Sequence, residues 1–102
     1  MNQAAMMKLK KMQKEMMENQ KRISESIFTG KAGGGMVEIQ MTGDHEVKKV
    51  TIDKDAFESK DDIEMIEDSI LAAFNDAIKQ IEAEQEKSLG GLSGMPGFGG
   101  LF

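Results

Sequence analysis

The residues of this chain best suited to chemistry are basic side chains close to its amino terminus. Lys10, Lys14 and Lys21 are separated by four and seven positions. A helix that turns about 100° per residue places them within about 40° of one another. Ammonium groups on one helix face can contact the phosphates of a nucleic acid, although the same pattern is also typical of a solvated face paired with neighbouring glutamates. The candidate phosphate-binding residues are Lys8, Lys10, Lys11, Lys14, Lys21 and Arg22.

The net charge of -5 conceals an uneven distribution of charge along the chain. Residues 1–31 carry seven basic and three acidic side chains, a net charge of +4, whereas residues 32–102 carry six basic and fifteen acidic ones, a net charge of -9. A charged partner responds to the local field within a Debye length of about 10 Å. The basic amino-terminal arm can therefore attract phosphate although the chain as a whole is acidic.

Other motifs of the sequence do not support an enzyme or a bound cofactor. Gly33, Gly34 and Gly35 follow Lys31 and precede a strand pattern, whereas a phosphate loop needs its lysine after the glycines and a helix behind it. His45 is the only histidine and lies in a predicted turn, where we expect it to be solvated and not a metal ligand. Without cysteine, and with a single histidine that is expected to be exposed, the usual pair of nucleophile and base cannot be assembled. We expect no catalytic residue, metal, cofactor or small-molecule substrate.

The composition also bears on the compartment. No run approaches the roughly 20 apolar residues that cross a bilayer, and the amino terminus lacks the apolar core of a signal peptide. The absence of cysteine fits a reducing compartment. We therefore expect a cytoplasmic protein without a membrane partner.

A long first helix is predicted to position the basic residues. Residues 3–25 contain no proline or glycine and are rich in methionine, lysine, glutamate and glutamine, which favour helices. Met6, Met7 and Met17 lie beside the central apolar stripe of this helix and are candidates for a dimer contact. The stripe itself has heptad spacing, which favours packing against another helix, and consists of Leu9, Met12, Met16 and Ile23.

Three strands are predicted after this helix. Residues 27–32 are short and mixed, residues 36–42 alternate apolar and polar side chains, and residues 47–52 bring two apolar side chains to one face. The connections are only a few residues long, which favours an antiparallel meander. The glycines at 33–35 are expected to supply positive φ at the first hairpin.

A second long helix is expected to cover one face of the sheet. Ser59 and Asp62 have the spacing of a capping box, which places the start of this helix near Lys60. Apolar residues then recur at steps of three and four over residues 63–81. Gly90 and Gly91 are expected to end the helix.

The predicted fold class is therefore α+β, in the order α-β-β-β-α, with an antiparallel sheet covered by a helix. Residues 1–89 form the single domain and residues 90–102 a flexible glycine-rich tail. A domain of this size buries a limited share of its apolar surface, so we expect a second copy to complete the core. The expected core and dimer residues are Leu9, Met12, Met16, Ile23, Val37, Ile39, Val50, Ile52, Ile70 and Phe74.

Nearly the whole chain resembles the YbaB/EbfC family of bacterial nucleoid-associated proteins. The resemblance lies in the methionine- and lysine-rich first helix, in "TGKAGGGMVEIQMTGDHEVKKVTID" and in "IEDSILAAFNDAIKQIEAEQEK". Its most specific residues include Thr29 and Gly30 before the glycine turn, Gly43, and residues 72–77. It implies a tweezer-like homodimer in which the sheets join at the centre and long helices project. It also implies double-stranded DNA as the partner, bound with little sequence preference and altered in shape, and a place in the nucleoid.

The family resemblance supplies no matched DNA-contact motif, so the assignment of the lysines and Arg22 to DNA binding rests on charge alone. The alternative is a protein interaction module, in which the methionine-rich helix or the tail with Phe98, Leu101 and Phe102 docks on a partner protein. The two hypotheses differ in their response to salt, because phosphate contacts weaken steeply as salt rises.

Overall fold

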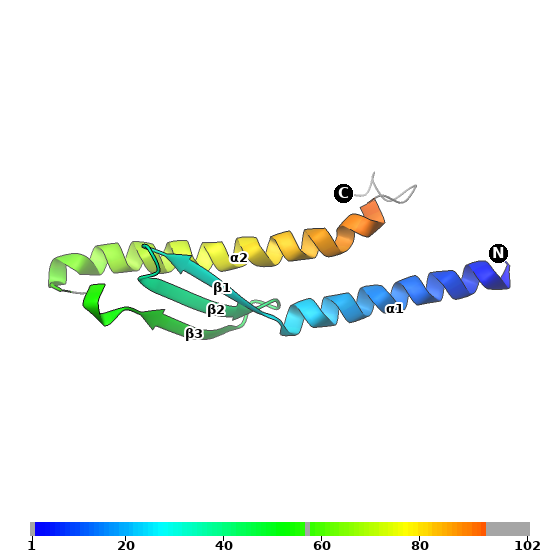
Figure 1. The fold of residues 1–102 in the computed structure, drawn as a ribbon, viewed down its shortest axis with the longest axis horizontal. Helices are drawn as coiled ribbons and strands as arrows, with labels where there is room; N and C mark the ends of the chain where they lie inside the picture. Colours follow the sequence, from blue (N-terminus) through cyan, green and yellow to red (C-terminus); the bar gives the residue numbers. More distant parts are fainter. Residues whose placement is uncertain (1, 57, 94–102) are drawn as a thin grey trace.

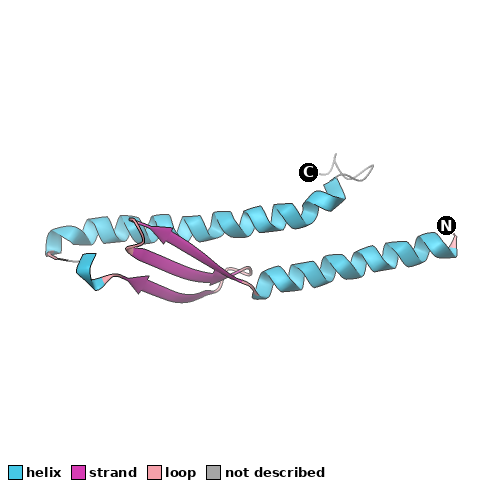
Figure 2. Ribbon diagram, in the orientation of Figure 1, coloured by secondary structure: helices cyan, strands magenta, loops and turns pink. Residues whose placement is uncertain are grey.

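The computed structural model describes residues 2–56 and 58–93, with the backbone alone for residues 89–93. Two long helices flank three strands (Figure 2), and this order confirms the predicted α-β-β-β-α fold class. The molecule is elongated, 70 × 24 × 16 Å, and α1 extends away from the sheet (Figure 1). The elements are α1 (Gln3–Glu25), β1 (Ile27–Ala32), β2 (Val37–Thr42), β3 (Val47–Ile52), the 3-10 turns η1 (Lys54–Ala56) and η2 (Lys60–Asp62), and α2 (Ile63–Ser93).

The three strands pair antiparallel in the order β1-β2-β3, as the short connections predict. Gly30 pairs with Ile39, and Ile39 pairs with Val50, so these three residues lie side by side on one face of the sheet. Three such rows build one apolar face, and they consist of Phe28, Met41 and Val47, of Gly30, Ile39 and Val50, and of Ala32, Val37 and Ile52.

The predicted glycine hairpin between β1 and β2 is confirmed. Gly33, Gly34 and Gly35 have φ values of 64°, 69° and 90°. The Met36 N–H donates a hydrogen bond of 3.3 Å to the Gly33 carbonyl. Glycine adopts positive φ without a steric cost, so the run serves the turn and does not cradle a phosphate.

α2 covers the part of the apolar face that β1 and β2 form. Partly buried Ile70 packs against the cluster nearer the start of the helix, and Phe28 against the other. The core of the single chain therefore lies between α2 and these two strands. Its buried members are Val37, Ile39 and Ala73 in one cluster, and Met41, Ala77 and Ile81 in the other.

α2 covers this face of the sheet, as predicted, but it does not extend over β3. Val47, Val50 and Ile52 are exposed, and Val50 retains 49% of its accessible surface. Neighbouring strands lie about 4.8 Å apart, so one helix about 10 Å wide covers roughly two of them. Phe74, one turn beyond Ile70 on α2, is also exposed. An apolar strip therefore stays uncovered in the single chain.

α2 approaches β1 most closely at Gly30. A Cβ atom at this position would lie 2.0 Å from the Ala73 carbonyl oxygen and 2.7 Å from the Ala77 backbone nitrogen. Distances this short leave no room for any side chain. Gly30 therefore allows the helix backbone to pack directly on the strand.

Two side chains of α2 hold the outer edge of β1 beside this contact. The Lys31 N–H donates to Asp76 Oδ2 at 3.0 Å, and Gln80 Nε2 donates to the Thr29 carbonyl oxygen at 2.8 Å. Gln80 Nε2 also lies 3.2 Å from Asp76 Oδ2. Because unpaired strand edges invite pairing with other chains, these hydrogen bonds close the β1 edge and leave β3 as the open one.

α1 is attached to the sheet through its last turn. Ile23 is buried, and a Cβ atom on Gly43 would lie 1.9 Å from the Ile23 carbonyl oxygen. Ser26 ends the helix, where its N–H donates to the Arg22 carbonyl at 3.0 Å and its own carbonyl accepts from the Gly43 N–H at 3.2 Å. The rest of α1 projects beyond this anchor (Figure 1).

The predicted cap of the second helix is confirmed, whereas its predicted end is wrong. Asp62 Oδ2 accepts from the Ser59 N–H at 3.1 Å in a complete capping box, and a 3-10 turn precedes the α-helix. The helix continues through Gly90 and Gly91 to Ser93. A helical glycine costs only about 1 kcal/mol relative to alanine, so two glycines do not by themselves end a helix. Residues 90–93 of the predicted tail, which spans residues 90–102, are therefore helical, and residues 94–102 lie outside the described residues.

Replacing Gly30 by alanine is expected to lower the free energy of unfolding by about 3 kcal/mol, because the added methyl group overlaps the α2 backbone. Gly34→Asn is the matched control, since Gly34 has positive φ but open space around it and asparagine tolerates that conformation. It is expected to change stability by less than about 1 kcal/mol. Urea denaturation followed by circular dichroism measures both, and equal midpoints would contradict the close contact.

Candidate nucleic-acid interface

The basic residues are carried by a helix that stands free of the body over most of its length. Asn2 caps α1, with its Oδ1 accepting from the Ala5 N–H at 2.8 Å. Good helix formers without glycine or proline then continue it to Glu25. Only the last turn is buried against the sheet, at Ile23. The sequence thus builds a projecting arm whose sides are open to a large partner.

Three of the predicted lysines come together on this arm. Lys10, Lys14 and Lys21 are exposed and border one shallow hollow on the surface of α1. Glu18 borders the same hollow, and its Oε1 lies 4.0 Å from Lys14 Nζ. An exposed ion pair at that distance contributes little and yields readily to a stronger anion. The arrangement is suited to phosphate contact.

The remaining predicted cations occupy other positions. Lys8 and Lys11 are exposed on α1 but do not border the hollow. Arg22 faces the second helix, where its Nη2 lies 3.6 Å from Glu84 Oε1. Arg22 therefore links the two helices in this structure, and the periodicity of α1 alone could not show that.

The apolar seam of α1 is only partly used within one chain. Ile23 is buried and Met12 half-buried, whereas Leu9 and Met16 are exposed. Met6, Met7 and Met17 are exposed as well, and Met17 retains 74% of its accessible surface. The single chain therefore leaves these side chains free for contact with another molecule.

The part of the chain that the structure describes shows neither a metal-binding cluster nor a membrane-spanning helix. The described residues contain no group of three or more histidine or acidic side chains arranged to hold a metal ion. His45 is exposed in the turn before β3, with a φ of 69°. Neither long helix, over its described residues, is apolar enough to span a membrane.

Sequence reasoning missed the contacts that join each long helix to the rest of the molecule. The hydrogen bonds of Asp76 and Gln80 to β1 and the pairing of Arg22 with Glu84 join segments far apart in the chain. Asp76 lies in the "AAFNDA" segment that carries the resemblance, which was the one available signal. Helical periodicity places such residues on a face but cannot name a partner on another element.

Together, the fold and the lysine arm define a small α+β protein that presents a basic helix away from an acidic body. The chain belongs to the YbaB/EbfC DNA-binding family, which it matches over residues 1–96. This confirms the resemblance read from the sequence.

Individual relatives agree with this assignment. The chain is 48% identical over 91 residues to a nucleoid-associated protein of Rickettsia bellii, an alignment that covers 85% of this chain and 84% of the relative. A nucleoid-associated protein of Rickettsia akari is 47% identical over the same coverage. The crystal structure of an uncharacterized protein from Helicobacter pylori superposes with a TM-score of 0.68 at 26% identity, covering 92% of this chain and 99% of that one.

The attachment of the arm is expected to depend on apolar burial far more than on the ion pair. Ile23→Ala should lower the free energy of unfolding by about 2–5 kcal/mol, because it leaves a cavity beneath the last turn of α1. Glu84→Gln removes the partly exposed partner of Arg22 and should cost less than about 1 kcal/mol. Urea denaturation compares the two variants, and a larger loss for Glu84→Gln would show that the ion pair holds the arm.

Proposed function

We propose that this protein is a nucleoid-associated homodimer that binds double-stranded DNA through the basic face of α1 and alters its shape. The observation that carries the proposal is the grouping of Lys10, Lys14 and Lys21 on an exposed, projecting helix in a chain of this DNA-binding family. The names of the Rickettsia relatives support a place in the nucleoid.

Binding by phosphate contact, with little base readout, fits the side chains available. Arginine paired with guanine is the commonest base-specific contact, and Arg22 is the only arginine of the chain. Its guanidinium is engaged with Glu84. Lysine ammonium groups act as point charges that contact phosphate in any sequence, so discrimination between sequences would come from DNA shape.

The acidic body restricts how DNA can approach. Residues 32–102 carry a net charge of -9, and the described part of α2 includes many exposed carboxylates. Phosphate brought close to that surface would be repelled. A contact confined to α1, with the acidic body turned away, brings phosphate to the basic residues and keeps it away from the carboxylates.

A second copy of the chain is the best candidate to cover the strip left open beside α2. Val47, Val50 and Ile52 of β3 are exposed on the same sheet face as the core, and Phe74 of α2 is exposed as well. The edge of β3 lies opposite the closed edge of β1. We assign this strip to the dimer contact, which would place the α1 arms of both copies on one assembly and double the number of phosphate contacts.

Charge reversal on α1 is expected to abolish most of the salt-dependent affinity. Lys10→Glu, Lys14→Glu and Lys21→Glu together remove three phosphate contacts per protomer, which should flatten the slope of log K against log salt by about 2.7 for each protomer that binds. Fluorescence anisotropy with labelled duplexes of two unrelated sequences, titrated across a salt series, measures the slope. Both duplexes are expected to bind the unmodified protein alike.

The control reverses three exposed lysines elsewhere, Lys54, Lys79 and Lys87, and so has the same net charge as the α1 variant. It should retain most of the affinity if the α1 face makes the contacts. An equal loss of DNA affinity in both variants would show that net charge, and not the α1 face, determines binding. If the unmodified protein does not bind even at low salt, the interaction-module hypothesis becomes the better one.

Val50→Asp is expected to convert the dimer to monomers, because it buries an unpaired carboxylate in the proposed contact. Thr51→Asp is the matched control, since Thr51 is the next residue along β3, is exposed and points to the opposite face. Sedimentation velocity distinguishes the outcomes, with circular dichroism to check the fold. A dimeric Val50→Asp variant would place the contact elsewhere.

A further inference from the structure

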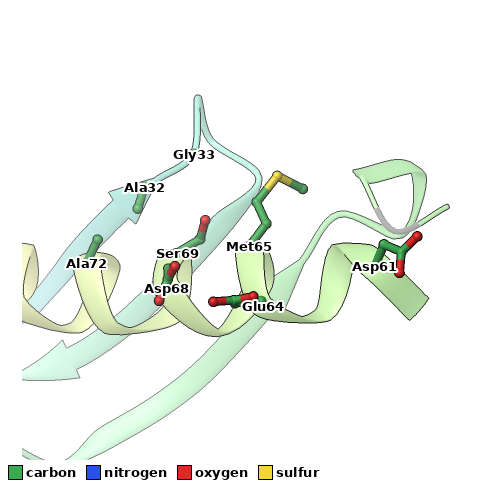
Figure 3. Close-up of a pocket in the computed structure, with 8 residues that line it drawn as sticks. All are labelled: Ala32, Gly33, Asp61, Glu64, Met65, Asp68, Ser69 and Ala72. Atoms are coloured by element: carbon green, nitrogen blue, oxygen red, sulfur yellow. The ribbon is translucent and has the colours of Figure 1, made fainter. Parts of the chain in front are cut away.

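An acidic hollow lies at the start of α2, on the flank of the helix away from the uncovered apolar strip. Figure 3 shows it beside the glycine turn between β1 and β2, where Met65 and Ser69 rise from α2 toward Gly33. Its three carboxylates belong to Asp61, Glu64 and Asp68. They are exposed, and none of them forms an ion pair with another described residue.

The hollow has the features of a surface that receives a cationic group. Ser69 retains only 8% of its accessible surface and lines the hollow, yet its hydroxyl forms no hydrogen bond with another described residue. No buried side-chain oxygen of the described residues lacks a partner, so the Ser69 hydroxyl is accessible from the hollow and can accept from a donor that comes from outside. The described residues offer no cluster that would hold a metal ion here. A lysine ammonium group, with its positive charge and three N–H donors, can pair with the carboxylates and donate to the hydroxyl.

The lysine hollow of α1 is complementary to it in both charge and apolar content. Lys10 and Lys14 are four residues apart on one helix, as Glu64 and Asp68 are on the other, so each pair is separated by about 6 Å along its axis. Met17 lies in the lysine hollow and is 74% exposed, whereas Met65, at 47%, lies in the acidic one. Methionine side chains adapt readily to one another at such contacts.

The two hollows cannot meet within one chain. The molecule is 70 Å long, and Figure 1 shows the amino-terminal end of α1 and the start of α2 at opposite ends of it. The contact must therefore join two copies.

We propose that the acidic hollow of one copy receives the lysine face of α1 from another copy, and that DNA phosphates compete for the same lysines. The docking itself requires no DNA, whereas the competition rests on the proposed function. Each copy has one donor face and one acceptor hollow, so the contact joins unlike surfaces and builds assemblies of several copies, either closed rings or open chains. In the absence of DNA, the acidic hollow of one copy would bind the lysine face that otherwise contacts DNA.

Reciprocal charge reversal tests the docking. The acid-reversed variant is Glu64→Lys with Asp68→Lys, and the base-reversed variant is Lys10→Glu with Lys14→Glu. In sedimentation experiments at low salt, the average mass of the unmodified protein is expected to rise with concentration to at least twice its value at high salt. Each variant alone should lose this rise, because like charges then face each other. A mixture of the two should regain it, because each reversed surface meets an opposite one.

A third variant controls for net charge. Glu82→Lys with Glu86→Lys carries the same charge change at two exposed positions of α2 outside the hollow. This control keeps both proposed surfaces, so on its own it should associate at low salt as the unmodified protein does, whereas the acid-reversed variant should not. Equal loss of association in the control and in the acid-reversed variant, or no rise in mass for the unmodified protein at low salt, would overturn the proposal.

Addition of DNA distinguishes the docking from the proposed function. Short duplex added to the unmodified protein should dissociate the assemblies, and the acid-reversed variant should bind DNA at least as tightly as the unmodified protein does. If DNA binding is absent while the reciprocal mixture associates, the proposed function fails and the docking stands. If the assemblies persist undiminished in saturating duplex, DNA and the acidic hollow do not compete for the same lysines, and that part of the proposal is overturned.

Discussion

The packing of the α2 backbone on β1 at Gly30 is the contact on which the rest of the structure depends. It sets the helix directly on the strand and brings Asp76 and Gln80 within hydrogen-bond distance of the strand edge. A larger residue at position 30 would lift the helix and open the core beneath Ala73 and Ala77. The register of α2, the closed edge of β1 and the burial of the core all follow from this one approach.

The same contact explains why the chain is incomplete alone. A helix held tightly over β1 and β2 is too narrow to reach β3, so the apolar row of Val47, Val50 and Ile52 stays in water. One sheet edge is closed by side chains while the other is open. Assembly is thereby directed to one side of the molecule, and the opposite flank of α2 is left with its acidic hollow.

Separation of charge along an elongated chain connects the two proposals. The basic arm and the acidic start of α2 stand at opposite ends of a molecule that is 70 Å long. Salt screens the field of each over a Debye length of about 10 Å. Neither can neutralise the other within one copy. Each is therefore available to an external partner, phosphate for the arm and ammonium for the hollow, and a second copy offers both.

Much of this architecture could be predicted from the sequence, because it depends on local patterns. The period of α1, the alternation around Ile39, the glycine turn and the cap at Ser59 each reflect forces between residues close in the chain. Only the tertiary structure decided which apolar residues are covered, that Arg22 pairs with Glu84, and that α2 runs past its glycines. Those outcomes depend on the width of a helix against a sheet and on contacts between distant segments, which no local period encodes.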